Sequence, residues 1–94
     1  MAIRTWASDE TRAIFQGRSS RLVPASVLAR AHRKLLILHA ATDLRDLRAP
    51  PSNRLEKLRG DRTGQMSIRI NDQYRVCFRW RSGDAYQVEI VDYH

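Results

Sequence analysis

The pattern of apolar and polar residues divides the chain into a helical first half and a second half built of strands. Residues 3–7 have the composition of a short first strand. Ser8 is followed by two acidic residues, the arrangement of a helix N-cap and first turn, because a side-chain oxygen and negative charge both stabilise a helix N-terminus. We expect this helix to end at about Gln16, before Gly17.

A second helix is expected to begin at Pro24, since proline fits the first turn of a helix. Its apolar residues recur at the i, i+3, i+4 spacing that places them on one buried face: Leu28, Ala31, Leu35 and Leu38. The cations of the same segment are expected on the other side: Arg30, Arg33 and Lys34. One more helical turn is expected around Leu44 and Leu47, before Ala49-Pro50-Pro51 ends the helical half, and Asn53 is assigned to the loop that follows.

From residue 55 onward the pattern has a period of two, which is typical of strands with one buried face. Apolar residues alternate with polar ones on both sides of a turn at Asn71-Asp72: Met66, Ile68 and Ile70, then Tyr74, Val76, Phe78 and Trp80. A second turn at residues 82–84 leads into a final strand over residues 85–91. Three consecutive strands joined by short turns predict an antiparallel meander with helices packed on one face. The expected fold is α+β, with one domain over residues 1–94.

The polar side of the middle strand carries Arg75, Cys77 and Arg79 in a row. We expect this row to make a basic floor on the sheet, although an ordinary solvated face is the commoner use of such a pattern. The final strand leads into Asp92-Tyr93-His94, three residues that can transfer protons or bind phosphate. We expect them to be held against the sheet, with the first and third side chains on one face and Tyr93 on the opposite one.

The charge balance favours an anionic partner. The chain has 17 basic and 10 acidic residues, a net charge of +7, and all but two of the cations are arginine. Arginine binds phosphate in a forked, planar geometry, which favours nucleic acid or an acidic protein as partner; arginine enrichment from a GC-rich genome is the alternative. The single cysteine excludes an internal disulfide, and no signal peptide or membrane-spanning run is present, so we expect a cytoplasmic protein without a membrane partner.

No metal ion or other cofactor is expected. The three histidines lack zinc-finger spacing, and Asp92 with His94 makes a poor metal site among so many cations. His32 and His39 fall on the second expected helix and are interpreted as packing or surface residues. Cys77 is interpreted as a small buried apolar residue rather than a nucleophile, and Trp6 and Trp80 most simply as core or edge aromatics; stacking of Trp80 on a base is the lesser alternative.

Three runs of the sequence together resemble the HigB toxins of the RelE/ParE superfamily of bacterial toxin–antitoxin systems: residues 55–62, 67–78 and 92–94. The likeness covers nearly the whole chain. It implies a RelE-like fold, with N-terminal helices packed on a small, curved, mainly antiparallel sheet. It also implies a toxin that cleaves translated mRNA in the ribosomal A site and so inhibits translation and growth. The implied partners are the ribosome, mRNA and a HigA-like helix-turn-helix antitoxin, with operator DNA reached only through the antitoxin.

RNA cleavage of this kind needs a base for the ribose 2′-hydroxyl, an acid for the leaving 5′-oxygen and cations at the phosphate. The resemblance implies Arg75 as the phosphate-stabilising residue and places Asp92, Tyr93 and His94 in the site. His94 is the natural proton-transfer group because its reference pKa is near neutrality, and Asp92 can orient its imidazole. Further cations are expected to contact RNA phosphates: Arg59, Arg62, Arg69 and Arg79.

Glu56 stands where well-studied relatives have a histidine. A glutamate can act as general base if burial raises its pKa, but beside a scissile phosphate it adds repulsion. Either Glu56 is the base, or it is a surface residue while His94 works with Lys57 and Arg75; we favour the second. Two other functions stay open: a ParE-like poison of DNA gyrase, against which the closing Asp-Tyr-His argues, and a catalytically weak toxin that serves as co-repressor with its antitoxin, which Glu56 favours.

Overall fold

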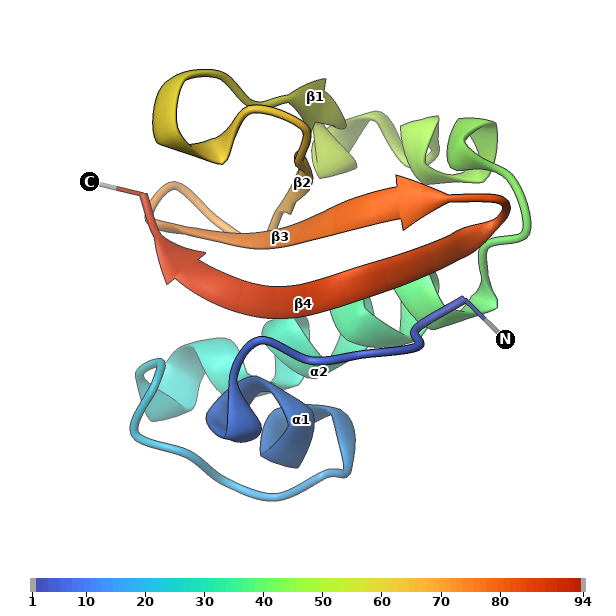
Figure 1. Ribbon diagram of the computed structural model, residues 1–94. Coiled ribbons are helices and arrows are strands. Elements are labelled where there is room, and N and C mark those ends of the chain that lie inside the picture. The colour runs from blue at the N-terminus through green and yellow to red at the C-terminus, as the bar shows by residue number, and fades with distance from the viewer. Residues whose placement is uncertain (1, 94) are drawn as a thin grey trace.

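The computed structural model describes residues 2–93 and places two helices on one side of a curved four-stranded sheet (Figure 1). The strand order is β1-β2-β3-β4, and every neighbouring pair is antiparallel. The strands span Glu56–Lys57 (β1), Met66–Arg69 (β2), Tyr74–Arg81 (β3) and Asp84–Asp92 (β4). The α+β architecture predicted from the sequence pattern is therefore confirmed.

The helices lie where the pattern predicts them. Helix α1 spans Asp9–Phe15, and the Ser8 side chain caps it by accepting a hydrogen bond from the Thr11 backbone N–H at 3.1 Å. Helix α2 spans Ala25–Ala40. Three short 3-10 helices follow at Leu44–Arg48, Pro51–Asn53 and Gly60–Arg62. The first of these is the expected extra turn around Leu44 and Leu47.

The hydrophobic core lies between α2 and the sheet. Leu35 and Leu38 of α2 are fully buried, as are Ile68 of β2 and Val76 and Phe78 of β3. Val76 and Phe78 share one face of β3 because two positions separate them, and Ile68 shares it because it is paired with Val76 across β2 and β3. The alternation in the sequence therefore identifies the core face of the sheet correctly. The opposite face of β3 carries Arg75, Cys77 and Arg79.

The N-terminal segment and β1 depart from the predicted strands. Residues 3–7 do not form a strand; they make two isolated parallel bridges to β4, Ile3 with Ala85 and Trp6 with Val88, and so cover its outer edge (Figure 1). At the other edge, β1 adds a fourth strand that the pattern does not predict. It has two residues, which is too short for a period of two to be recognised.

Lys34 was expected on the polar side of the second helix and is instead buried. Its Nζ donates a hydrogen bond to Oδ1 of Asn53, whose side chain is also buried and donates to the carbonyl oxygens of Leu47 and Ala49 at 3.2 Å each. Desolvation, reinforced by three neighbouring arginines, lowers the pKa of Lys34; they are Arg30, Arg33 and Arg69. The prediction fails because Asn53 supplies an acceptor from a distant part of the chain.

The polar row on β3 is covered over most of its length, so the expected open basic floor is wrong for two of its three members. Arg75 and Cys77 are buried, and only Arg79 is exposed. Cys77 lies opposite Glu89 of β4, which forms an ion pair with Arg62 at 3.3 Å. Side chains from the segment between β1 and β2 thus reach across this face of the sheet.

Candidate active site

Arg75 lies at the centre of the candidate site, with its guanidinium fixed by two neutral acceptors. Its Nε donates to Oγ of the buried Ser67 at 2.7 Å, and Nη2 donates to the carbonyl oxygen of Arg54 at 2.6 Å. The side chain is only 10% exposed. Neutral acceptors orient the guanidinium without cancelling its charge, which suits a group that stabilises an anion.

Glu56 provides the one carboxylate that forms an ion pair with Arg75 among residues 2–93. Its Oε1 lies 3.5 Å from Nη2, and its side chain is half exposed. Glu56 is paired with Ser67 across β1 and β2, so its side chain belongs to the same sheet face as Arg75. Glu56 therefore lies directly beside the candidate phosphate-binding cation.

Tyr93 approaches Arg75 from the other side. The Arg75 guanidinium carbon lies 5.5 Å from the centroid of the Tyr93 ring, within the range of a cation–π contact. The Tyr93 backbone N–H donates to the carbonyl oxygen of Gln73 at 2.6 Å, which holds this residue against the start of β3. Tyr93 therefore lies on the Arg75 side of the sheet, on the face of β4 opposite to Asp92.

Asp92 lies on the opposite face of β4 from Tyr93, so the expectation that it lies on the Arg75 side of the sheet is wrong. It is paired with Tyr74, and its Oδ2 accepts a hydrogen bond from Nε2 of Gln73 at 3.0 Å. His94, the predicted proton-transfer group, lies outside the described residues. The expected sharing of one face by Asp92 and His94 therefore stays a prediction.

Lys57 is not brought together with Arg75. It is paired with Met66, a residue that packs against the core, so it belongs to the opposite face of β1 from Glu56. There it lines an open pocket of about 400 Å³ with Leu44 and Met66 among others. The proposed cooperation of Lys57 with Arg75 therefore has no support in the arrangement of β1.

The four other predicted phosphate-binding arginines are dispersed. Arg59 is exposed and precedes the 3-10 helix at Gly60–Arg62. Arg62 is engaged by Glu89, and Arg69 forms an ion pair with Asp72. Arg79 is exposed on the same side of β3 as Arg75 and forms no ion pair within residues 2–93. Arg69 is paired directly with Arg75 across β2 and β3 but is engaged by Asp72. Arg79 is therefore the one of the four that shares the Arg75 side of β3 and forms no ion pair within residues 2–93.

Sequence reasoning missed the groups that orient the site. Ser67 lies on the polar side of β2, but an alternating serine gives no sign that it will accept a hydrogen bond from an arginine. Arg54 lies in the left-handed region, with φ of 44°. The direction of its carbonyl group could not be predicted from its residue type. Gln73, which contacts both Asp92 and Tyr93, follows the turn that the sequence does reveal.

The remaining candidates are structural residues. Nδ1 of His32 bonds to the carbonyl oxygen of Ile14 at 2.8 Å, and the His39 ring lies edge-on to Phe15 at 5.1 Å, so both link α2 to α1 as expected. Burial raises the pKa of the Cys77 thiol, as expected for a small buried residue. Within residues 2–93 no group of three His, Cys, Asp or Glu side chains is placed to hold a metal ion, and no helix there is long and apolar enough to cross a membrane.

Comparison with known proteins identifies the family. Residues 5–94 match the model of the RelE-like toxin of type II toxin–antitoxin system HigB. The chain belongs to this family. The family is one of paired toxins and antitoxins, so an antitoxin is its partner.

Named relatives agree with this assignment. Toxin HigB-1 of Vibrio cholerae is 51% identical over 65 residues, which are 69% of this chain and 68% of that protein. Endoribonuclease HigB of Proteus vulgaris is 29% identical over 92 residues, 98% of this chain and 99% of the relative. The resemblance drawn from the three sequence runs is confirmed.

Proposed function

We propose that this HigB-family toxin is an endoribonuclease that cleaves translated mRNA in the ribosomal A site. The observation that carries the proposal is Arg75: a buried guanidinium held by Ser67 and the Arg54 carbonyl, with the Tyr93 ring beside it. A prepositioned cation of this kind is what a developing phosphorane requires. The name of the Proteus vulgaris relative, Endoribonuclease HigB, supports the same reaction.

In the proposed reaction the ribose 2′-oxygen bonds to phosphorus and the bond from phosphorus to the 5′-oxygen breaks. The products are a 2′,3′-cyclic phosphate and a 5′-hydroxyl. Arg75 bonds to the non-bridging phosphate oxygens as negative charge builds there. Its Nη1 makes no hydrogen bond or ion pair to residues 2–93, so this group can bind phosphate while Ser67 and Arg54 keep their bonds.

The reaction also needs one proton removed from the 2′-hydroxyl and one delivered to the 5′-oxygen. We assign one of these transfers to His94. Asp92 is given no part beside Arg75, because it pairs with Tyr74 and so lies on the other face of β4. The Tyr93 ring is assigned to holding the Arg75 guanidinium. Glu56 is assigned no proton transfer. Its carboxylate lies 3.5 Å from Arg75 and competes with the phosphate for that cation.

The proposed partners follow from this reaction. The toxin works on the ribosome in the cytoplasm, where translated mRNA is found. A HigA-like helix-turn-helix antitoxin silences it, and operator DNA is contacted only through that antitoxin. The charge of +7 suits both ribosomal RNA and an antitoxin with an acidic surface.

Expression without the antitoxin tests the proposal. Wild-type protein should stop growth, and primer extension should reveal cuts within translated codons. Arg75→Ala and His94→Ala should relieve toxicity and remove the cuts. The matched control is Arg21→Ala, which deletes the same charge from an exposed turn, and it should stay toxic. Circular dichroism checks that each variant folds.

Three outcomes would contradict the proposal. Full toxicity of folded Arg75→Ala and His94→Ala would remove the assigned catalytic groups. DNA damage signalling without mRNA cuts would favour the gyrase poison instead. Tight antitoxin binding by a wild-type protein without toxicity would favour the co-repressor.

A further inference from the structure

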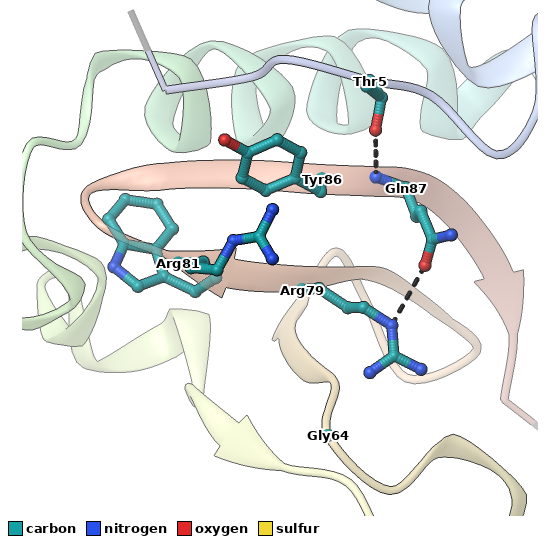
Figure 2. A pocket seen from close by; sticks show the side chains of 7 residues that line it. Thr5, Gly64, Arg79, Arg81, Tyr86 and Gln87 are labelled. Atoms are coloured by element: carbon teal, nitrogen blue, oxygen red, sulfur yellow. Dashed lines mark hydrogen bonds between the residues drawn. The ribbon is translucent and has the colours of Figure 1, made fainter.

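A basic pocket lies farther along the strand that carries Arg75. It encloses about 500 Å³ at the hairpin end of β3 and β4 and is lined by Thr5, Gly64, Arg79, Trp80, Arg81, Tyr86 and Gln87 (Figure 2). Arg79 and Arg81 follow Arg75 at even spacing and so lie on the same side of β3. At the usual rise of a strand, Arg79 begins about 13 Å from Arg75. A single RNA strand bound at Arg75 can therefore continue into this pocket.

The Arg79 guanidinium is held in place from two sides. Its Nε donates to Oε1 of Gln87 at 3.0 Å, and the Gln87 backbone N–H donates to Oγ1 of Thr5 at 2.8 Å (Figure 2). Gln87 adopts φ of 54° in the β-bulge where the register between β3 and β4 shifts. On the other side, a Cβ on Gly64 would lie 2.6 Å from Nη1 of Arg79, so the guanidinium packs directly on that glycine.

The rest of the pocket offers flat surfaces for stacking. The Arg81 guanidinium carbon lies 5.1 Å from the centroid of the Tyr86 ring, and the two side chains lie next to each other in the pocket lining (Figure 2). Half-buried Trp80 contributes a second aromatic side chain to the lining. Aromatic rings and guanidinium planes are the surfaces on which bases of single-stranded nucleic acids stack.

The positive charge of this pocket is not balanced by the protein. Arg62, Arg69 and Arg75 each form an ion pair with a carboxylate. Within residues 2–93, by contrast, neither Arg79 nor Arg81 has a carboxylate partner. An orienting network built around an uncompensated cation indicates a ligand with negative charge.

We propose that this pocket is a nucleotide subsite, in which Arg79 binds a phosphate of the mRNA and the Arg81–Tyr86 pair stacks on a base flanking the cut. The inference rests on the proposed ribonuclease function and adds a place where a base beside the cleavage position is read. RNA would use both features of the pocket: its phosphate would bind the oriented Arg79 guanidinium, and its base would stack on the Arg81–Tyr86 pair. An acidic segment of the antitoxin would bind the two arginines but would not explain the stacking surface of Arg81 and Tyr86.

Binding of a fluorescein-labelled single-stranded RNA oligonucleotide at low salt, followed by fluorescence anisotropy, tests the subsite without requiring cleavage. Tyr86→Ala should weaken binding by about fivefold or more, the effect of removing one stacking partner. Tyr86→Phe keeps the ring and should bind close to wild type. Arg21→Ala loses a charge outside the pocket and serves as the electrostatic control; Arg81→Ala should weaken binding more than this control.

A second readout maps the cuts on translated mRNA. Tyr86→Ala should still cut, but with the base preference beside the cut altered. The proposal is overturned if Tyr86→Ala and Arg81→Ala bind RNA no worse than Arg21→Ala, and equally if they lose affinity for the antitoxin alone, which would make the pocket a protein interface. Failure of the proposed function looks different: wild-type protein then binds RNA through Tyr86 but cuts no mRNA.

Discussion

The guanidinium of Arg75 makes a cation–π contact with the ring of Tyr93, with 5.5 Å between the guanidinium carbon and the ring centroid. Arg75 belongs to the middle of the sheet, whereas Tyr93 follows the last residue of β4. A backbone hydrogen bond to Gln73 fixes Tyr93 in this position. The end of the last strand thus closes one side of the site, and the ring limits where the guanidinium can move.

Substitutions of Tyr93 separate its ring from its hydroxyl group. Tyr93→Phe keeps the cation–π contact and should retain most of the rate of mRNA cleavage on programmed ribosomes. Tyr93→Ala removes the contact and should slow cleavage by about tenfold, the value of a partly desolvated cation–π pair. If Tyr93→Phe is as slow as Tyr93→Ala, the hydroxyl takes part in proton transfer and the assignment to the ring is wrong.

Ser67 should control cleavage through Arg75, since its Oγ accepts the Nε hydrogen bond at 2.7 Å. Ser67→Ala leaves a buried charged donor without this acceptor, which should lower the free energy of unfolding by about 1–3 kcal/mol. Cleavage should slow as well, because the guanidinium is no longer oriented. Urea unfolding and cleavage rates measure the two effects, with exposed Ser26→Ala as control. A loss of stability with unchanged cleavage would show that Ser67 does not position Arg75.

Glu56 variants decide between a bystander and a general base. Glu56→Gln removes a carboxylate that lies 3.5 Å from Arg75, so cleavage should be maintained or become faster. Glu56→His, which restores the family's residue, should be faster still. The measurement is the single-turnover rate of mRNA cleavage. A loss of about a hundredfold or more in Glu56→Gln would instead identify Glu56 as the base.

Lys34 should make the free energy of unfolding vary with pH in the alkaline range. Its pKa is lowered in the folded chain, chiefly by burial, so the unfolded chain binds more protons between the folded and the ordinary pKa. Its contribution to the free energy of unfolding is therefore constant below the folded pKa and grows as pH rises toward the ordinary value. Urea unfolding of wild type and Lys34→Met should show the difference shifting in favour of wild type with rising pH. A pH-independent difference would mean that Lys34 titrates normally.

Much of the fold follows from the sequence because local rules decide it. The period-two alternation places Val76 and Phe78 in the core and Arg75 on the other face, and Ser8 caps α1 as its position indicates. The same local rules give the wrong position for Lys34, which is buried. A cation on a helix is expected in water unless an acceptor such as Asn53 reaches it, and that acceptor is supplied by tertiary structure.

The site is predicted in part, for the same reason. The sequence singles out Arg75 and Tyr93 as candidate site residues, and the structure brings their side chains into contact. The face on which each closing residue lies depends on the register between β3 and β4, which pairs Asp92 with Tyr74. That Lys57 lies on the other face of β1 from Glu56 could not be predicted, because β1 has two residues and no pattern reveals its pairing.

The most direct test of the account is the chemistry of the cut made by purified protein on ribosomes programmed with a defined mRNA. Attack by the 2′-oxygen under the control of Arg75 predicts a 2′,3′-cyclic phosphate and a 5′-hydroxyl at the new ends. A single 2′-deoxy substitution at the cleaved nucleotide should then abolish the cut, while the same substitution elsewhere in the mRNA has no effect. Cleavage of the deoxy-substituted mRNA at the wild-type rate, or ends bearing a 5′-phosphate and a 3′-hydroxyl, would contradict it.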